Sequence, residues 1–339
     1  MHEGEKVFDA GALSLGQTAL DRTVLRASVF ANVAWFHTVS PMVTADVSAT
    51  GSTGSLLDQA GPVARRFACR DRVLVLDGTP KLVGIVNVTD DSFFDGGQFG
   101  SCEAAIAHGL KLIEEGAAMI DVGGQSTRPG FVEVSVDEEI ARVVPVIAAL
   151  AAKTLVPLSI DTYKPAVARA ALAAGAHVLN DIHGFQGDQA LPGIAAEARC
   201  AVILMHNDAS FKAVHVDLIA SMLAFFDRSL ATAARAGVAR EAIVLDPGIG
   251  FGKTQEQNLE LLARLGELRV LGLPLLIGAS RKSVIGNVLA LPPEERLEGT
   301  LATTALAVSQ GVEFIRVHDV RANLRAAQVA AAIRIHSKP

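Results

Sequence analysis

The sequence predicts an α/β protein of the (β/α)8 TIM-barrel class with an N-terminal extension. Eight short apolar runs alternate with longer stretches in which Ala, Leu and Ile recur at helical spacing. This alternation is typical of parallel strands, buried on both faces, that are joined by helices. The runs end on polar residues or glycine. In a barrel such residues gather at the C-terminal mouth of the strands, where active sites lie.

The expected strands follow one another in order along the chain. The first four runs are LVGIV, ending at Asn87, MIDVGG, which contains Asp121, VPLSI, ending at Asp161, and HVL, ending at Asn180. The next four are AVILM, ending at His206, AIVL, ending at Asp246, LPLLIGAS, ending at Ser280, and EFIRVH, which contains Arg316 and His318. Eight strand–helix units in one chain favour a closed barrel over an open sheet.

Residues 1–66 precede the first expected strand and are predicted to be an extension, with the barrel formed by 67–339. The extension contains the only tryptophan, Trp35, and a Gly/Ser/Thr-rich stretch at Ser48–Ser55 that is typical of a loop or linker. A packed domain of this size would be only marginally stable alone. The sequence assigns no role to this segment.

Composition limits the classes of partner and compartment. Half of the 339 residues (50%) are hydrophobic and 19% are charged, which favours an ordered chain with a large core. The net charge of −6, with scattered lysines and arginines, argues against nucleic acid and anionic membranes as partners. We expect no membrane span and no signal peptide. The cysteines, Cys69, Cys102 and Cys200, lack metal-type spacing, which favours free thiols in the cytoplasm.

Carboxylate and amide groups end four of the expected strands. The amide oxygen of Asn87, which opens the loop NVTDDSFFDGG, is a hard ligand suited to Mg²⁺, although a solvated turn is the alternative. Asp161, Asn180 and Asp246 form an array that suits the NH-rich edge of a pterin or guanine. For each aspartate the alternative is capping of the following helix.

Cations follow the last two strands, and donor-rich loops flank them. Lys282, Arg316 and His318 lie where barrels often bind phosphate, although surface or structural roles are the alternatives. The loop GGQSTRPG offers the donors of Arg128, and its glycines allow close approach of a ligand. DPGIGFGKT lacks the Walker and dinucleotide spacings, so we interpret it as a tight turn that presents Phe251.

From about Arg70 to the C-terminus the chain resembles the dihydropteroate synthases. The markers, in the order of the family, are VGIVNVTDDSFFDGG, GGQSTRPG, SIDTYKP, LNDIHG, LMH, DPGIGFGKT, GASRKS and RVHDV. The resemblance implies a Mg²⁺-dependent transferase of folate biosynthesis and, on the same ground, a cytoplasmic homodimer. Such enzymes join 6-hydroxymethyl-7,8-dihydropterin diphosphate to 4-aminobenzoate and release pyrophosphate and 7,8-dihydropteroate.

The resemblance also assigns roles position by position. The residues that match the pterin site are Asp161, Asn180, Met205, Asp246 and Lys282. Those that match the diphosphate site are Asn87, which also matches the metal ligand, Arg128, Arg316 and His318. Those that match the 4-aminobenzoate site are Phe93, Thr127, Arg128, Pro129, Phe251 and Ser283. The expected catalytic residues are Asp95, Lys282, Arg316 and His318. A dissociative transition state, in which leaving-group charge is stabilised, needs no strong base.

Three residues of the first two loops depart from the family pattern. Asp90 stands where proline is usual, Phe94 where serine is usual, and Gln125 where glutamate is usual. Loss of the proline is expected to loosen the first loop, and the two changes in that loop motivate a hypothesis of altered sulfonamide sensitivity. The alternatives to the synthase are a non-catalytic pterin-binding paralogue, a methyltetrahydrofolate-dependent methyltransferase on the same barrel, and a phosphate-sugar aldolase.

Overall fold

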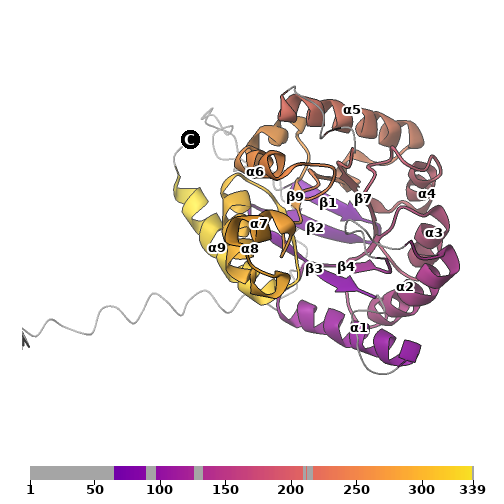
Figure 1. The fold of residues 1–339 in the computed structure, drawn as a ribbon. Helices are drawn as coiled ribbons and strands as arrows, with labels where there is room; N and C mark the ends of the chain where they lie inside the picture. The colour runs from indigo at the N-terminus through magenta and orange to yellow at the C-terminus, as the bar shows by residue number, and fades with distance from the viewer. Residues whose placement is uncertain (1–64, 89–96, 126–132, 209–210, 212–216, 338–339) are drawn as a thin grey trace, which may run out of the picture. The chain divides into compact units, whose positions relative to one another are not determined.

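The computed structural model describes residues 65–88, 97–125, 133–208, 211 and 217–337, and its main feature is a closed barrel of parallel strands (Figure 1). Eight strands pair in the order β8-β7-β6-β5-β4-β3-β10-β9, and each of these pairs is parallel. A parallel bridge between Leu245 and Leu275 joins the two outer strands. Helices surround the strands as a ring. The predicted TIM barrel is confirmed.

The barrel strands coincide with the eight apolar runs. Their bounds are β3 Lys81–Asn87, β4 Met119–Gly123, β5 Leu158–Asp161, β6 Val178–Asp181, β7 Ala201–Met205, β8 Ile243–Asp246, β9 Leu276–Ile277 and β10 Phe314–Val317. His206 and His318 each follow the last residue of a strand directly, whereas the predicted run of Ser280 continues beyond the short β9. The polar run ends therefore lie at or just past the C-terminal mouth.

Helices connect the barrel strands, and some of them begin at a side-chain cap. They are α1 Gly97–Glu114, α2 Val136–Ala151, α3 Pro165–Ala173, α4 Leu191–Ala198, α5 Leu218–Ala236, α6 Gln255–Ala263, α7 Ser283–Leu289, α8 Leu297–Ser309 and α9 Val320–His336. Short 3-10 helices span Arg240–Ala242 (η3), Leu265–Leu271 (η4) and Pro293–Glu295 (η5). Ser135 caps α2, and Thr254 forms a capping box with Gln257 at α6. No described helix is long and apolar enough to cross a membrane.

A hairpin that the sequence analysis did not predict precedes the barrel. Strands β1 Arg65–Cys69 and β2 Arg72–Leu76 are antiparallel, and Phe67 is fully buried against Phe314 with ring centroids 5.3 Å apart. Phe314 opens β10, and the first residues of β4, β6 and β7 belong to the same buried cluster as Phe67, so the hairpin covers the N-terminal end of the barrel. Because β1 starts at Arg65 and residues 1–64 lie outside the described ranges, the 1–66 extension stays a prediction.

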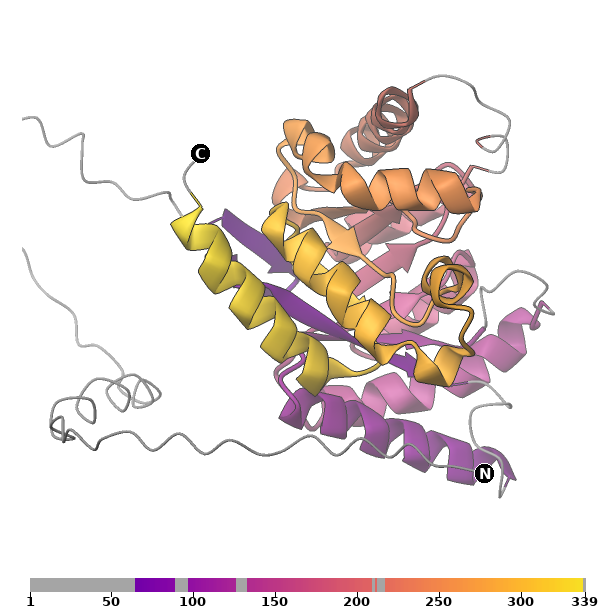
Figure 2. The ribbon, with the colours of Figure 1, turned by 60° about the vertical axis from the view of Figure 1, so that its left-hand side comes forward.

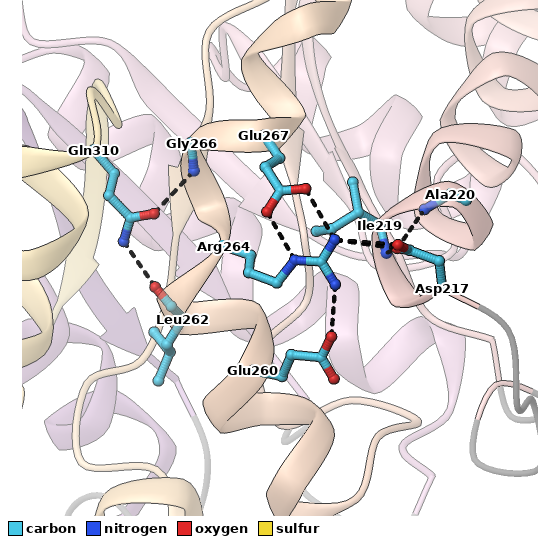
Figure 3. Close-up of polar contacts among 9 residues, drawn as sticks. All are labelled: Asp217, Ile219, Ala220, Glu260, Leu262, Arg264, Gly266, Glu267 and Gln310. Atoms are coloured by element: carbon cyan, nitrogen blue, oxygen red, sulfur yellow. Dashed lines mark hydrogen bonds and ion pairs between the residues drawn. The ribbon is translucent and has the colours of Figure 1, made fainter. Parts of the chain in front are cut away.

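Polar contacts on the outer ring tie neighbouring helices together. Arg264, at the end of α6, donates to Glu260 and Glu267 at 2.7 Å each and to Asp217 at 3.2 Å (Figure 3). Asp217 is also the N-cap of α5, and Gln310 bridges the Leu262 carbonyl and the Gly266 amide beyond α8. These carboxylates are exposed, so each ion pair contributes little stability. The cluster links the start of α5 to α6 and η4 on the outer surface of the ring.

Candidate functional site

Arg316 is the centre of a polar network on the floor of the barrel mouth. Its Nε donates to Asp121 Oδ2 at 2.6 Å and its Nη2 donates to Asp161 Oδ2 at 2.9 Å. Asn180 Nδ2 donates to the same Asp121 oxygen at 3.1 Å. β10, β4, β5 and β6 each contribute one member. The network thus contains three predicted site residues, Arg316, Asp161 and Asn180. It also contains Asp121, which the sequence analysis placed in a strand without assigning it a role.

Two buried oxygens in this network have no hydrogen-bond partner among the described residues. They are Asp121 Oδ1 and Asp161 Oδ1, and Asp121 is fully buried. A buried acceptor without a donor costs roughly 1–3 kcal/mol, and such groups are rare in native proteins unless a water or ligand completes them. Two carboxylate oxygens close to one arginine therefore call for an incoming group that carries N–H or O–H donors.

Burial also raises the pKa of carboxyl groups at the barrel mouth. It raises the pKa of Asp161 to about 7, an effect that Arg316 opposes and the neighbouring Asp121 reinforces. The pKa of Asp246 is raised by burial as well, against the attraction of Lys282. Both carboxyl groups lie at the C-terminal ends of strands. Exclusion of solvent from the barrel mouth therefore decides how much negative charge these two groups present to a ligand.

Asp246 and Lys282 form the wall beside this floor. Gly248 N donates to Asp246 Oδ1 at 2.7 Å, while Lys282 Nζ donates to the Ile249 carbonyl at 2.6 Å. The same ammonium lies 4.6 Å from the centroid of the Phe251 ring, a cation–π distance. Burial lowers the pKa of Lys282 to about 8, and Asp246 opposes the shift. The predicted turn that presents Phe251 thus brings its ring to the predicted lysine.

His318 and Asn87 lie at the remaining side of the mouth. Ser280 Oγ is 3.0 Å from His318 Nδ1, which fixes the orientation of the imidazole. A Cβ added at Gly123 would lie in ordinary van der Waals contact with both Asn87 Oδ1, at 4.0 Å, and Asp161 Oδ2, at 3.9 Å, so these two side chains flank the end of β4. The amide oxygen of Asn87 is a hard ligand that fits Mg²⁺, which keeps waters and substrate phosphates as its other ligands. The described residues contain no group of three or more Asp, Glu, His or Cys side chains placed to bind a metal.

The helix-capping alternative is wrong for Asp161. The N-cap of α3 is Lys164, without a side-chain cap, and Asp161 pairs with Arg316 instead. Asp246 binds the backbone of its own turn, at Gly248, which is a local structural role in addition to any ligand contact. Arg281, next to Lys282, forms a two-point ion pair with Asp319.

The other predicted residues divide by whether the structure describes them. Met205 ends β7, is buried and pairs across the sheet with Asp246, while Ser283 is exposed at the first position of α7. Those that lie outside the described residues are Asp90, Phe93, Phe94, Asp95, Thr127, Arg128 and Pro129. The 4-aminobenzoate half of the predicted site is therefore represented here by Phe251 and Ser283 alone.

Gln125 anchors the start of the second loop from behind. Its Oε1 accepts hydrogen bonds from Lys164 Nζ at 2.7 Å and from Val134 N at 3.0 Å, and its Nε2 donates to Tyr163 OH at 2.9 Å. Lys164 also pairs with the buried Glu139 at 2.9 Å. The side chain at this departure from the family pattern thus binds protein groups on the segments that precede α2 and α3.

Sequence reasoning missed the buried lysine of the Asp246–Thr254 turn, Lys253. Its Nζ lies 3.0 Å from Nδ1 of His206 and donates to the carbonyls of Gly248 and Phe251 at 3.0 Å each. Burial lowers the pKa of Lys253 to about 7 and that of His206 to about 3. The one available signal was the lysine of GFGK, which in the sequence could have been a solvated side chain.

Comparisons with known proteins agree on one group. The model of the pterin binding enzyme family matches residues 83–318. A Clostridium beijerinckii dihydropteroate synthase is 47% identical over 253 residues, which are 74% of this chain and 93% of the relative. The Xanthomonas albilineans dihydropteroate synthase solved with 4-aminobenzoic acid is 44% identical, with a TM-score of 0.76 over 81% of this chain and 100% of that one. A Yersinia pestis dihydropteroate synthase solved with a sulfonamide drug is 42% identical, with a TM-score of 0.74 over 80% of this chain and 99% of that one.

Proposed function

Because the chain belongs to the pterin binding enzyme family and matches dihydropteroate synthases over nearly their full length, we infer that it catalyses their reaction. It condenses 6-hydroxymethyl-7,8-dihydropterin diphosphate with 4-aminobenzoate and releases pyrophosphate and 7,8-dihydropteroate. The observation that carries this conclusion from the geometry is the pair of unpartnered, buried oxygens of Asp121 and Asp161. The 2-amino-4-oxo edge of a pterin supplies the N–H donors that such oxygens lack.

The floor and wall bind the two ends of the pterin diphosphate differently. Asp161, Asn180 and Asp246 offer acceptors and an amide to the ring, at the C-terminal ends of β5, β6 and β8. Arg316 uses Nε and Nη2 on the two aspartates, and its Nη1 has no hydrogen-bond partner among the described residues. We propose that Nη1, with His318, binds the diphosphate, so one guanidinium connects the ring site to the leaving-group site.

Charge stabilisation explains how this arrangement accelerates the reaction. When the C–O bond to diphosphate breaks, negative charge grows on the leaving oxygens and positive charge on the exocyclic carbon of the pterin. Arg316 and Lys282 supply fixed positive charge in a site that excludes water, where it is most effective. The aminobenzoate nitrogen is a neutral nucleophile and needs no strong base. Positioning and leaving-group stabilisation are therefore the tasks of the residues present.

We propose Mg²⁺ as the cofactor, held by Asn87. Asn87 ends β3, which pairs with β10, the strand that carries Arg316 and is followed directly by His318. When bound, the ion would neutralise charge on the diphosphate. Titration of Mg²⁺ into the protein with pyrophosphate, beside Asn87→Ala, tests this proposal. Equal Mg²⁺-dependent pyrophosphate binding in both proteins would refute it.

We also propose a homodimer that forms through α8 and α9, which run side by side at one side of the barrel (Figure 2). Val329 and Ile333, one turn apart on α9, expose 62% and 64% of their surface, and Leu306 of α8 exposes 42%. Apolar side chains gathered on two adjacent helices are typical of a protein–protein contact.

A cytoplasmic location remains our proposal, supported by the free thiols Cys69, Cys102 and Cys200.

The direct test is detection of 7,8-dihydropteroate by mass spectrometry after incubation with both substrates. The product should require 4-aminobenzoate, pterin diphosphate and Mg²⁺ together. A sulfonamide that competes with 4-aminobenzoate should inhibit the reaction, as the Yersinia pestis complex supports for this site. Binding of the pterin diphosphate without product would instead identify a non-catalytic paralogue.

A further inference from the structure

Lys253 is a buried ammonium group whose contacts all lie behind the pterin-binding turn. Its Nζ donates to the carbonyls of Gly248 and Phe251, both at 3.0 Å, and lies 3.0 Å from His206 Nδ1 and 3.4 Å from the His206 carbonyl. Within the described residues it hydrogen-bonds no carboxylate. A buried lysine bound only to uncharged acceptors is unusual, because an ammonium is normally paired when it is desolvated.

His206 is held so that it accepts from this lysine. Its ring lies 4.7 Å from the Phe211 ring and 4.5 Å from the Phe225 ring, centroid to centroid. Burial and the positive charge of Lys253 lower the pKa of His206 to about 3, so the imidazole is neutral at physiological pH. The Nδ1 lone pair is then available to the ammonium, and the pair fixes the end of β7 to the turn that follows β8.

The turn itself is packed against the backbone after β7 without space for side chains. A Cβ at Gly248 would lie 2.1 Å from the His206 carbonyl oxygen, and one at Gly252 would lie 2.6 Å from the Asp208 carbonyl oxygen. Both glycines adopt left-handed backbone, at φ +70° and +59°. The ammonium of Lys253 therefore contacts both the turn and the backbone that follows β7, where these two segments pack closely together.

Three groups of the proposed active site depend on this turn. Asp246 precedes it and accepts from Gly248 N, the carbonyl of Ile249 accepts from Lys282, and the ring of Phe251 faces the Lys282 ammonium. The carbonyls that Lys253 binds, at Gly248 and Phe251, flank Ile249 on both sides. Displacing them would move the acceptor that orients Lys282 and the ring beside it.

We propose that Lys253 is a positioning residue for pterin binding: through His206 and the carbonyls of Gly248 and Phe251 it fixes the turn that places Asp246, Phe251 and Lys282 at the pterin. It does not touch the substrate. Its role rests on the proposed function, since the turn serves a pterin only if the site binds one. Burial lowers the pKa of Lys253 to about 7, although the negative charges of Asp246 and Asp208 oppose this shift. The lowered pKa reflects the cost of burying this cation.

The test compares Lys253→Met, which keeps the aliphatic length and removes the donors, with Thr304→Val. Thr304 donates to Asn323 at 2.7 Å in a buried contact between α8 and α9, so its variant reports lost stability far from the turn. Calorimetry measures the Kd of 6-hydroxymethylpterin, which lacks the diphosphate and cannot react. We expect about a tenfold or larger increase for Lys253→Met, and a Kd within about threefold of wild type for Thr304→Val.

Amide hydrogen exchange of residues 248–252 is the second readout, because a general loss of stability would not accelerate these amides alone. We expect faster exchange there in Lys253→Met, and the same exchange as wild type in Thr304→Val. A folded Lys253→Met with wild-type Kd and wild-type exchange in the turn would overturn the proposal. Wild-type protein that binds no pterin would instead overturn the proposed function, and the inference with it.

Lys253→Arg keeps the proposal testable if the methionine variant does not fold. Arginine retains a buried cation but cannot place a single nitrogen at all four acceptors. The pterin Kd should therefore rise by about threefold or more, with KM for the pterin diphosphate rising and KM for 4-aminobenzoate changing less. An unchanged pterin Kd in the folded arginine variant would contradict a positioning role for this lysine.

Discussion

Replacement of Asp161 by asparagine tests the role of the unpartnered oxygen on the barrel floor. The wild-type carboxylate presents Oδ2 to Arg316 Nη2 at 2.9 Å and leaves Oδ1 buried without a donor among the described residues. In Asp161→Asn the amide nitrogen cannot face the guanidinium, because two donors would meet. The amide oxygen must therefore take the arginine side, and the amide N–H₂ must face the ligand.

This exchange turns a charged acceptor into a donor at the pterin edge. A hydrogen bond to a charged group is worth about 1.5–3 kcal/mol, so the pterin Kd should rise about 10- to 100-fold. The assay is calorimetric titration with 6-hydroxymethylpterin. Since burial raises the pKa of Asp161 to about 7, wild-type affinity should also increase as pH rises from 6 toward 7.5, and this increase should vanish in the variant.

Asp181 supplies the matched control. It is also buried at the end of a strand, next to Asn180, but its oxygens accept backbone N–H groups of His183 and Phe185 at 2.9 Å and 2.7 Å. Asp181→Asn should lower stability and leave the pterin Kd within about threefold of wild type. A folded Asp161→Asn that binds pterin as well as wild type would refute the assignment of Asp161 to the ligand.

Four further predictions concern stability, the turn and assembly. His206→Gln should remove a pH dependence of the free energy of unfolding. With its folded pKa lowered from 6.5 to about 3, His206 contributes stability that is complete above pH 6.5 and is lost as pH falls toward 3. Urea unfolding at several pH values measures this loss. Gly248→Ala should lower the free energy of unfolding by about 1–3 kcal/mol or more and weaken pterin binding, because its Cβ would lie 2.1 Å from a carbonyl oxygen at φ +70°; unchanged thermal unfolding would contradict the close approach. Phe67→Ala should cost about 3–5 kcal/mol in chemical unfolding through loss of the ring buried under the barrel, with the pterin Kd unchanged in the folded protein. The pair Val329→Glu and Ile333→Glu should convert a dimer to a monomer in light scattering, and a dimer that persists would exclude this face of α9.

The barrel was predictable because a parallel strand buried on both faces has a simple signature. LVGIV and AVILM need no alternation, and the polar residue that ends each run marks the mouth. The hairpin was not predictable in the same way. RRFAC buries only Phe67 and Cys69, and RVLVL buries only Leu76, so neither run of five residues has a long apolar or alternating pattern. The partners of the hairpin, such as Phe314, are far away in the sequence.

The site was predictable where a polar residue ends a strand, and missed where it lies inside one or behind a turn. Asp161 and Asn180, predicted for the pterin, lie in one network with Arg316, predicted for the diphosphate. Asp121, in the middle of β4, was passed over although a charged residue within a buried strand requires a partner. Lys253 could not be found from spacing. Its acceptors are backbone carbonyls and a histidine, which leave no pattern in the sequence.

Pyrophosphate release tests the central claim most directly. Purified protein is given 6-hydroxymethyl-7,8-dihydropterin diphosphate and Mg²⁺, with and without 4-aminobenzoate, beside Arg316→Ala and Thr304→Val. Sustained release that requires 4-aminobenzoate, persists in Thr304→Val and collapses in Arg316→Ala is the result we predict, because Arg316 joins the pterin floor to the leaving group. No release from wild-type protein, or equal release from Arg316→Ala, would contradict this assignment of reaction and site.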